Sequence, residues 1–349
     1  AMQPVETTLD RALPGAGVTP IHTGAEPLTE SFTGAGVILG IIDRGFDLDH
    51  SAFKRKDGSN RVLSIWDQSA MSGNPPGGRW TYGNVCTMQD INAGCRIENT
   101  QSAHGTHVAG IAGGSPVGNL PYAGAAPDSD LIFVQLPAVG ADWETTSEPA
   151  SDGHICDGAA WVFSQAYEQN KPAVINMSVG SHWGPHDSTS LASQCLTNLT
   201  LRGDGSTVPG KILVAAAGNE GAGGGLGWID YGQGWERTPA YTHATALVGA
   251  EPVYAPFRVG FDHYVGTDRE PIEIFQDLVS FWFNGEHNLK VRVGVVHSDT
   301  DITWTPEYAY DDLLNQGQVQ LLTSPEGVYG HVSVMGDVNS EGARCIRAY

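Results

Sequence analysis

The sequence predicts an α/β fold with a mainly parallel sheet, followed by an all-β domain. In the first part of the chain, short continuous apolar runs alternate with segments whose apolar residues recur at helical spacing. This alternation is typical of parallel strands that helices cover on both faces. From about residue 253 it gives way to short strand-like segments separated by turn residues. We therefore expect an arm over 1–33, an α/β core over 34–252 and a β-sandwich-like domain over 253–349.

Most elements of the α/β core follow from the apolar pattern. Buried strands are predicted at 34–42, 130–136, 173–179, 211–217 and 245–249. Helices are predicted at 104–113, 157–169 and 188–202, with Asp157 as the N-cap of the second. The polar segment 54–100 predicts a long connection with a hairpin around residues 62–66.

The second part of the chain predicts strands almost throughout. They are expected at 272–275, 278–283, 289–297, 318–322, 330–334 and 343–349. Turn residues such as Asn284-Gly285 separate them, and one short helix is expected at 309–314. Short strands with frequent turns are typical of a sandwich.

The charge of the chain restricts its partners. With 39 acidic and 18 basic residues, the formal net charge is −21. This charge argues against nucleic acid or an anionic membrane as a partner. No apolar run approaches the ~18 residues needed to span a bilayer. Cation binding and simple solubility both remain compatible with so many carboxylates.

Five cysteines suggest an oxidising compartment without settling their pairing. No CxxC pair occurs, which argues against a zinc site. Cys86 and Cys95 could close a loop in an exported protein, and Cys156 and Cys195 could form a second bridge. Cys345 is either a buried thiol or has its partner beyond this chain.

Three chemically distinctive residues stand at the ends of predicted elements. Asp43 closes the first strand, His104 opens a helix and Asn219 follows a later strand. In α/β sheets, reactive groups gather at the carboxyl ends of strands. A carboxylate can orient a histidine that acts as general base for a serine, and an asparagine amide can stabilise the oxyanion. Taken singly, each residue has a simpler role, as a cap, a packed histidine or a turn.

Four motifs in a fixed order extend this interpretation. They are VILGIIDRGFDLDHSAF at 37–53, HGTHVAG at 104–110, VINMSVGSHWG at 174–184 and VAAAGNEG at 214–221. Together they resemble the motifs of subtilisin-like serine proteases. The resemblance implies a subtilisin-like three-layer fold, with a jelly-roll-like insertion over 253–349 that the end of the chain leaves incomplete.

The same resemblance implies a role for each matching residue. Asp43 would orient His104, His104 would act as general base and then general acid, and Asn219 would donate to the oxyanion. Ser178, Val179 and Gly180 would pair with the substrate backbone and form one wall of the P1 pocket. One residue departs from the pattern, because Arg44 stands where a small hydroxyl residue is usual. This leaves the details of hydrogen bonding at Asp43 open.

The serine motif of the family is missing from these 349 residues. No Gly-Thr-Ser-Met-Ala-type segment occurs, and the later serines fall in β-like runs or turns, at Ser280, Ser298, Ser324, Ser333 and Ser340. The chain stops at Tyr349, inside a predicted strand. The simplest account is a separate C-terminal fragment of the same polypeptide that carries the serine and stays bound. Self-cleavage after Tyr349 and a cloned truncation are equally consistent with the sequence.

The expected function is therefore a serine endopeptidase that hydrolyses peptide bonds only together with its serine-bearing segment. The alternative is a catalytically inactive subtilase-like protein that acts as a binding or regulatory module. No cofactor is expected for the chemistry. Structural calcium could be bound by carboxylates such as Asp47 and Asp49, although no pattern defines a metal site. The resemblance, the acidity and the cysteines favour a secreted or extracellular protein.

Overall fold

The structure is a computed structural model, and it divides the chain into two compact units. Unit 1 comprises residues 1–180 with 191–216, and unit 2 comprises 181–190 with 217–349. The residues described are 9–97, 102–118, 122–137, 151–180, 188–218, 226–230, 235–239, 279–283, 288–298, 301–314, 318–324, 327–338 and 344–348. The domain boundary predicted near residue 252 lies outside them.

Unit 1 is built on a six-stranded sheet in the order β3-β2-β4-β1-β5-β6. The parallel strands are β2 (Val62–Asp67), β4 (Asp130–Gln135), β1 (Ile38–Asp43), β5 (Ala173–Met177) and β6 (Lys211–Ala215). The edge strand β3 (Asn84–Thr87) runs antiparallel to β2. The four predicted strands that fall in this sheet are confirmed. The expected hairpin is wrong in its position, because Val62–Asp67 is one strand whose antiparallel partner begins only at Asn84.

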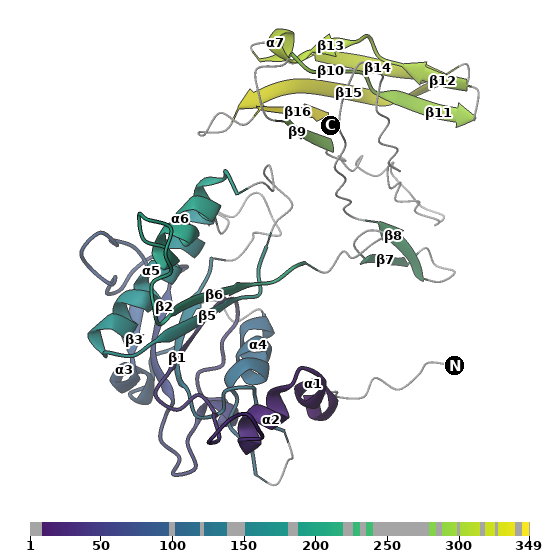
Figure 1. Ribbon diagram of the computed structural model, residues 1–349. Helices are drawn as coiled ribbons and strands as arrows, with labels where there is room; N and C mark the ends of the chain where they lie inside the picture. The colour runs from purple at the N-terminus through teal and green to yellow at the C-terminus, as the bar shows by residue number, and fades with distance from the viewer. Residues whose placement is uncertain are drawn as a thin grey trace. The chain divides into compact units, whose positions relative to one another are not determined.

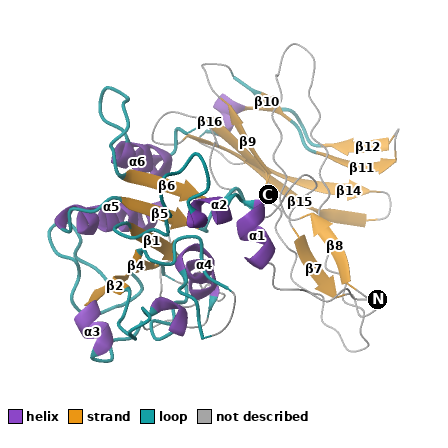
Figure 2. Cartoon of the chain, turned by 60° about the horizontal axis from the view of Figure 1, so that its bottom comes forward, coloured by secondary structure: helices purple, strands orange, loops and turns teal. Residues whose placement is uncertain are grey.

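Helices cover both faces of this sheet, which gives the predicted three layers (Figures 1 and 2). Helix α4 (His104–Gly113) lies on one face, and α5 (Asp152–Glu168) and α6 (Leu191–Thr200) lie on the other. The central strand β1 shows why both faces need cover. Ile38 and Ile42 join the apolar core beneath α5, whereas Leu39 and Ile41 join the core beneath α4. Burial on both faces explains the continuous apolar run in the sequence.

The predicted start of the second core helix is wrong. Helix α5 begins at Asp152, and the backbone amide of its N-cap residue Ser151 donates to Nδ1 of His154 (3.1 Å). The residue predicted as N-cap, Asp157, lies inside the helix and accepts from Trp80 Nε1 (3.0 Å) and the Tyr82 hydroxyl (3.1 Å). The first turn of this helix is polar. The apolar pattern that predicts the helix therefore begins only after the residue at which the helix starts.

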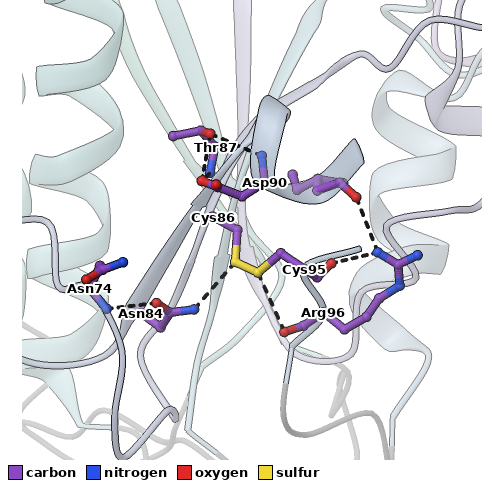
Figure 3. The surroundings of a disulfide bond; sticks show 8 residues. Asn74, Asn84, Cys86, Thr87, Asp90, Cys95 and Arg96 are labelled. Carbon is purple, nitrogen blue, oxygen red and sulfur yellow. Dashed lines mark hydrogen bonds between the residues drawn. A yellow bond between two sulfur atoms is a disulfide. The ribbon is translucent and has the colours of Figure 1, made fainter. Parts of the chain in front are cut away.

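Two disulfides confirm both of the suggested cysteine pairs. Cys156 in α5 is joined to Cys195 in α6, which ties together the two helices on one face of the sheet. Cys86 in β3 is joined to Cys95, just after α3 (Met88–Asn92), and Figure 3 shows its surroundings. Next to it, Arg96 donates to the carbonyl oxygen of Cys95 (2.7 Å). Cys345 is a buried thiol outside both bridges.

The segment predicted as an arm, residues 1–33, contains helical turns that the sequence analysis does not predict. Helices α1 (Leu9–Gly15) and α2 (Val18–Thr23) lie within it, and Nε2 of His22 hydrogen bonds the carbonyl oxygen of Ala125 (2.7 Å). A 3₁₀ turn, η1 (Ser51–Phe53), follows the first strand of the sheet. The helices were missed because prolines interrupt their short sequences.

The described residues of unit 2 from 279 onward are mainly β-structure, as predicted, whereas the sequence analysis predicts no strands at 226–239, where the structure has two. An antiparallel sheet has the order β14-β15-β16-β9, and pairs form between β7 and β8, β10 and β13, and β11 and β12. The elements are β7 (Leu226–Asp230), β8 (Trp235–Pro239), β9 (Val279–Phe283), β10 (Lys290–Val291), β11 (Gly294–Ser298), β12 (Asp301–Trp304), β13 (Tyr308–Ala309), α7 (Tyr310–Leu313), β14 (Gln318–Ser324), β15 (Gly327–Val338) and β16 (Arg344–Ala348).

One segment of unit 2 differs from the prediction, and two predicted strands fall outside the described residues. The single strand predicted at 289–297 is wrong, because β10 and β11 divide that segment. The strands predicted at 245–249 and 272–275 lie outside the described residues. The jelly-roll arrangement stays a prediction.

Candidate active site

The carboxyl ends of three neighbouring strands define the candidate site. Ile42 of β1 is in register with Met177 of β5, and Met177 is in register with Ala215 of β6. Because these strands are parallel, the residues that follow them emerge at one edge of the sheet. Asp43 and Ser178 therefore lie at the same edge.

Asp43 and His104 form a hydrogen-bonded pair although 61 positions separate them in the chain. His104 Nδ1 lies 2.7 Å from Asp43 Oδ1. The aspartate side chain is 2% exposed, whereas the histidine side chain is 56% exposed. A carboxylate oxygen accepts, so Nδ1 is the nitrogen that donates. The other ring nitrogen, Nε2, is then left as the proton acceptor on the accessible side of the pair.

Backbone contacts hold the first turn of α4 against the turn after Asp43. The amide of Gly105 donates to the carbonyl oxygen of Arg44 (2.6 Å), and the amide of Thr106 donates to that of Gly45 (3.0 Å). The Thr106 hydroxyl also donates to Gly45 (3.0 Å) and accepts from the amide of Asp47 (2.8 Å). These bonds explain the Gly-Thr that follows His104, since a Cβ on Gly105 would come within 2.9 Å of the Arg44 oxygen.

The turn after Asp43 depends on Gly45 and on Gln135, which sequence reasoning missed. Gly45 has a φ of +78°, and an added Cβ would lie 1.8 Å from the carbonyl oxygen of Ser102. Its amide donates to the buried side-chain oxygen Oε1 of Gln135 (2.8 Å). Gln135 ends β4, next to β1. The one feature of the sequence that could have indicated the role of Gln135 is its polar amide at the end of an apolar strand.

Gly45→Ala is expected to impair peptide hydrolysis by the complete protein. The new methyl group would push away Ser102, whose hydroxyl accepts from the amide of His104 (3.1 Å). A displacement of about 1 Å at a catalytic group lowers the rate by about 100-fold. We therefore expect kcat to fall by about that factor, measured with a peptide substrate.

Gly58→Ala provides the matched control. Gly58 has a φ of +84°, but an added Cβ meets nothing within 4 Å. It should cost about 1–2 kcal/mol of stability through the left-handed conformation and leave kcat unchanged. If both variants lose activity equally, the role of the Gly45–Ser102 contact is refuted.

Of the four other predicted site residues, the structure describes the three that follow β5 but not Asn219. Ser178 and Val179 are half-buried and Gly180 is exposed, all directly after β5. The Ser178 hydroxyl accepts from the side-chain amide of Asn176 (2.9 Å). Asn219 lies outside the described residues, just after Gly218, whose φ of +91° requires glycine. The roles in substrate binding and oxyanion stabilisation stay predictions.

Other histidines of unit 1 have different surroundings. His107 is exposed on α4, and Nδ1 of His50 accepts from the amide of Ala52 (3.3 Å) as the cap of η1. Among the residues the structure describes, no group of three or more His, Cys, Asp or Glu side chains could hold a metal ion. The calcium expectation stays untested.

The structure thus combines a three-layer α/β fold with a buried Asp hydrogen-bonded to an exposed His at one edge of its sheet. Residues 34–252 match the peptidase S8, or subtilase, family, and the chain belongs to that family.

Known relatives agree with this assignment. The chain is 28% identical over 263 residues to the subtilisin-like protease PopC of Myxococcus xanthus, covering 69% of this chain and 46% of PopC. It is 30% identical over 225 residues to a subtilisin of Bacillus pumilus, covering 64% and 59%. The chain therefore spans about half the length of these relatives.

One solved structure supports the fold. The CspB protease of Clostridium perfringens superposes with a TM-score of 0.52 at 19% identity, covering 91% of this chain and 57% of CspB. No helix in the described part of the chain is both long and apolar enough to cross a membrane.

Proposed function

We propose that this chain supplies the Asp and His of a serine endopeptidase. The observation that carries the proposal is the 2.7 Å contact between buried Asp43 and exposed His104. Its support is the family, whose relatives named above are proteases. The reaction is hydrolysis of a peptide bond and needs no cofactor.

The proposed mechanism assigns one role to each residue. Nε2 of His104 takes the proton from a serine hydroxyl as its oxygen attacks the substrate carbonyl, and Asp43 stabilises the imidazolium. His104 then gives this proton to the leaving amine. In the second half of the reaction, a water molecule takes the place of the serine hydroxyl: His104 removes its proton, its oxygen attacks the acylated serine, and the carboxylic acid product leaves as the serine hydroxyl is restored. The side chain of Asn219 donates to the oxyanion, which contributes about 2.7–4 kcal/mol. Residues 178–180 pair with the substrate backbone as an added strand.

The serine in this proposal belongs to a separate C-terminal segment of the same polypeptide. Two observations support it: no Gly-Thr-Ser-Met-Ala-type motif occurs in the 349 residues, and the chain spans about half of its relatives.

We also propose that the protein works in an oxidising, extracellular setting. Its support is the pair of disulfides in unit 1, because such bonds persist in exported proteins and are rare in the cytosol.

The experiment combines intact mass with active-site labelling of the purified protein. We expect a second fragment that copurifies, carries a Gly-Thr-Ser motif and reacts with a fluorophosphonate probe. A single 37.0 kDa species that the probe does not label would contradict the protease and favour the inactive binding module.

A further inference from the structure

Arg44 is held next to the catalytic pair by its own backbone. Its amide donates to Asp43 Oδ1 (2.7 Å), the same oxygen that accepts from His104. Its carbonyl oxygen accepts from Gly105, the residue after His104. The backbone of Arg44 therefore contacts both Asp43 and the first turn of the helix that carries His104.

The guanidinium group of Arg44 lacks the partners that buried arginines normally have. The side chain is partly buried, its Nε is fully buried without an acceptor, and within the described part of the structure the group makes no hydrogen bond or ion pair. Arg61 shows the usual arrangement: it is also buried, but it donates to carbonyl oxygens of Gly113 (2.6 Å) and Ser129 (2.6 Å). Arg96 likewise pairs with Asp49.

An unpaired buried donor is costly, and the cost is higher for a charged group. Burial lowers the pKa of Arg44, and the attraction of Asp43 only partly opposes this effect. The nearby carboxylate attracts this charge without a direct contact: Asp43 Oδ1 accepts hydrogen bonds from the Arg44 amide and from His104, and Oδ2 is buried without a hydrogen-bond partner. The site thus holds a partly buried cation that makes no direct contact with a carboxylate, next to Asp43 and His104.

We propose that Arg44 is a specificity-determining residue that binds an acidic side chain of the substrate close to the scissile bond. Guanidinium and carboxylate groups match in a two-point, charge-assisted hydrogen bond, which a small hydroxyl residue at this position cannot make. This inference rests on the proposed function, since it assigns a substrate class to the same site.

The test compares matched peptides on the complete, serine-containing protein. Each pair differs only by Asp versus Asn, or Glu versus Gln, at one of the three positions on either side of the scissile bond. For the wild type we expect kcat/KM to favour the acidic peptide by about 10- to 100-fold at one position, the range that a hydrogen bond to a charged group gives. In R44S this ratio should fall to about one while neutral peptides are still cleaved.

Two further variants make the result decisive. R44K keeps the charge without the two-point geometry and should retain an intermediate preference. R55S removes a cation that pairs with Asp130. Asp130 is the first residue of β4 and therefore lies at the opposite edge of the sheet from Asp43. This variant should keep the wild-type ratio of kcat/KM between acidic and neutral peptides.

The possible failures are distinguishable. An acidic preference that is equal in wild type and R44S, or absent from an active wild type, overturns this inference and leaves the protease intact. A wild type that neither cleaves peptides nor reacts with a fluorophosphonate overturns the proposed function and this inference with it.

Discussion

Replacing His104 with alanine is expected to lower kcat of the complete protein by about 10⁴- to 10⁶-fold, the loss seen when the base of a serine triad is removed. The reason is that specific contacts hold His104 in place: Asp43 binds its Nδ1, and the first turn of α4 is fixed to the turn after Asp43. The measurement is the rate of peptide hydrolysis under saturating substrate, with the melting temperature recorded to confirm folding.

His107→Ala is the matched control for this prediction. His107 lies on the same helix, one residue after Thr106, and is exposed. The variant removes an imidazole from the same element and should hydrolyse the peptide at the wild-type rate. Retained activity in His104→Ala, or an equal loss in His107→Ala, would remove His104 from the mechanism.

Asp43→Asn is expected to lower kcat by about 10⁴-fold, far more than its loss of stability accounts for. The asparagine amide can donate to Nδ1 of His104, which would place the imidazole proton on Nε2, the atom that must accept it from serine. For this, the amide nitrogen must take the place of Oδ1, where it would lose the hydrogen bond from the amide of Arg44 (2.7 Å), so some loss of stability accompanies the change. The fall in kcat should therefore exceed what any change in melting temperature explains.

Asp67→Asn tests whether the effect belongs to the contact with His104. Asp67 is also a buried aspartate at the carboxyl end of a strand, and its Oδ1 accepts from the amide of Ser69 (2.9 Å). We expect a change in stability and an unchanged kcat. If the two aspartate variants lose activity to the same extent, Asp43 acts through the fold and not through His104.

Much of unit 1 could be predicted because its sheet is covered on both faces. Strands such as Ile38–Asp43 need apolar residues at nearly every position, and this produces runs that are easy to recognise. Polar first turns carry no such signal, which is why the start of α5 was placed at Asp157 and not at Asp152.

Contacts between distant segments account for most of what was missed at the site. Gln135 supports Gly45 from a neighbouring strand 90 positions away, and nothing local to either residue indicates the pairing. In the same way, the sequence shows that Arg44 departs from the family pattern, but only packing reveals that its Nε is buried without a hydrogen-bond acceptor.

By itself, the sequence determined the family, the parallel strands and the two residues, Asp43 and His104, that carry the proposed chemistry. It could do so because strand ends and helix starts are local features that a short motif records. Tertiary structure alone decided that these residues meet at 2.7 Å, that one is buried while the other faces solvent, and that Nε of Arg44 is buried beside them without a hydrogen-bond acceptor. These properties depend on distance and desolvation, which arise only when segments 61 positions apart pack together.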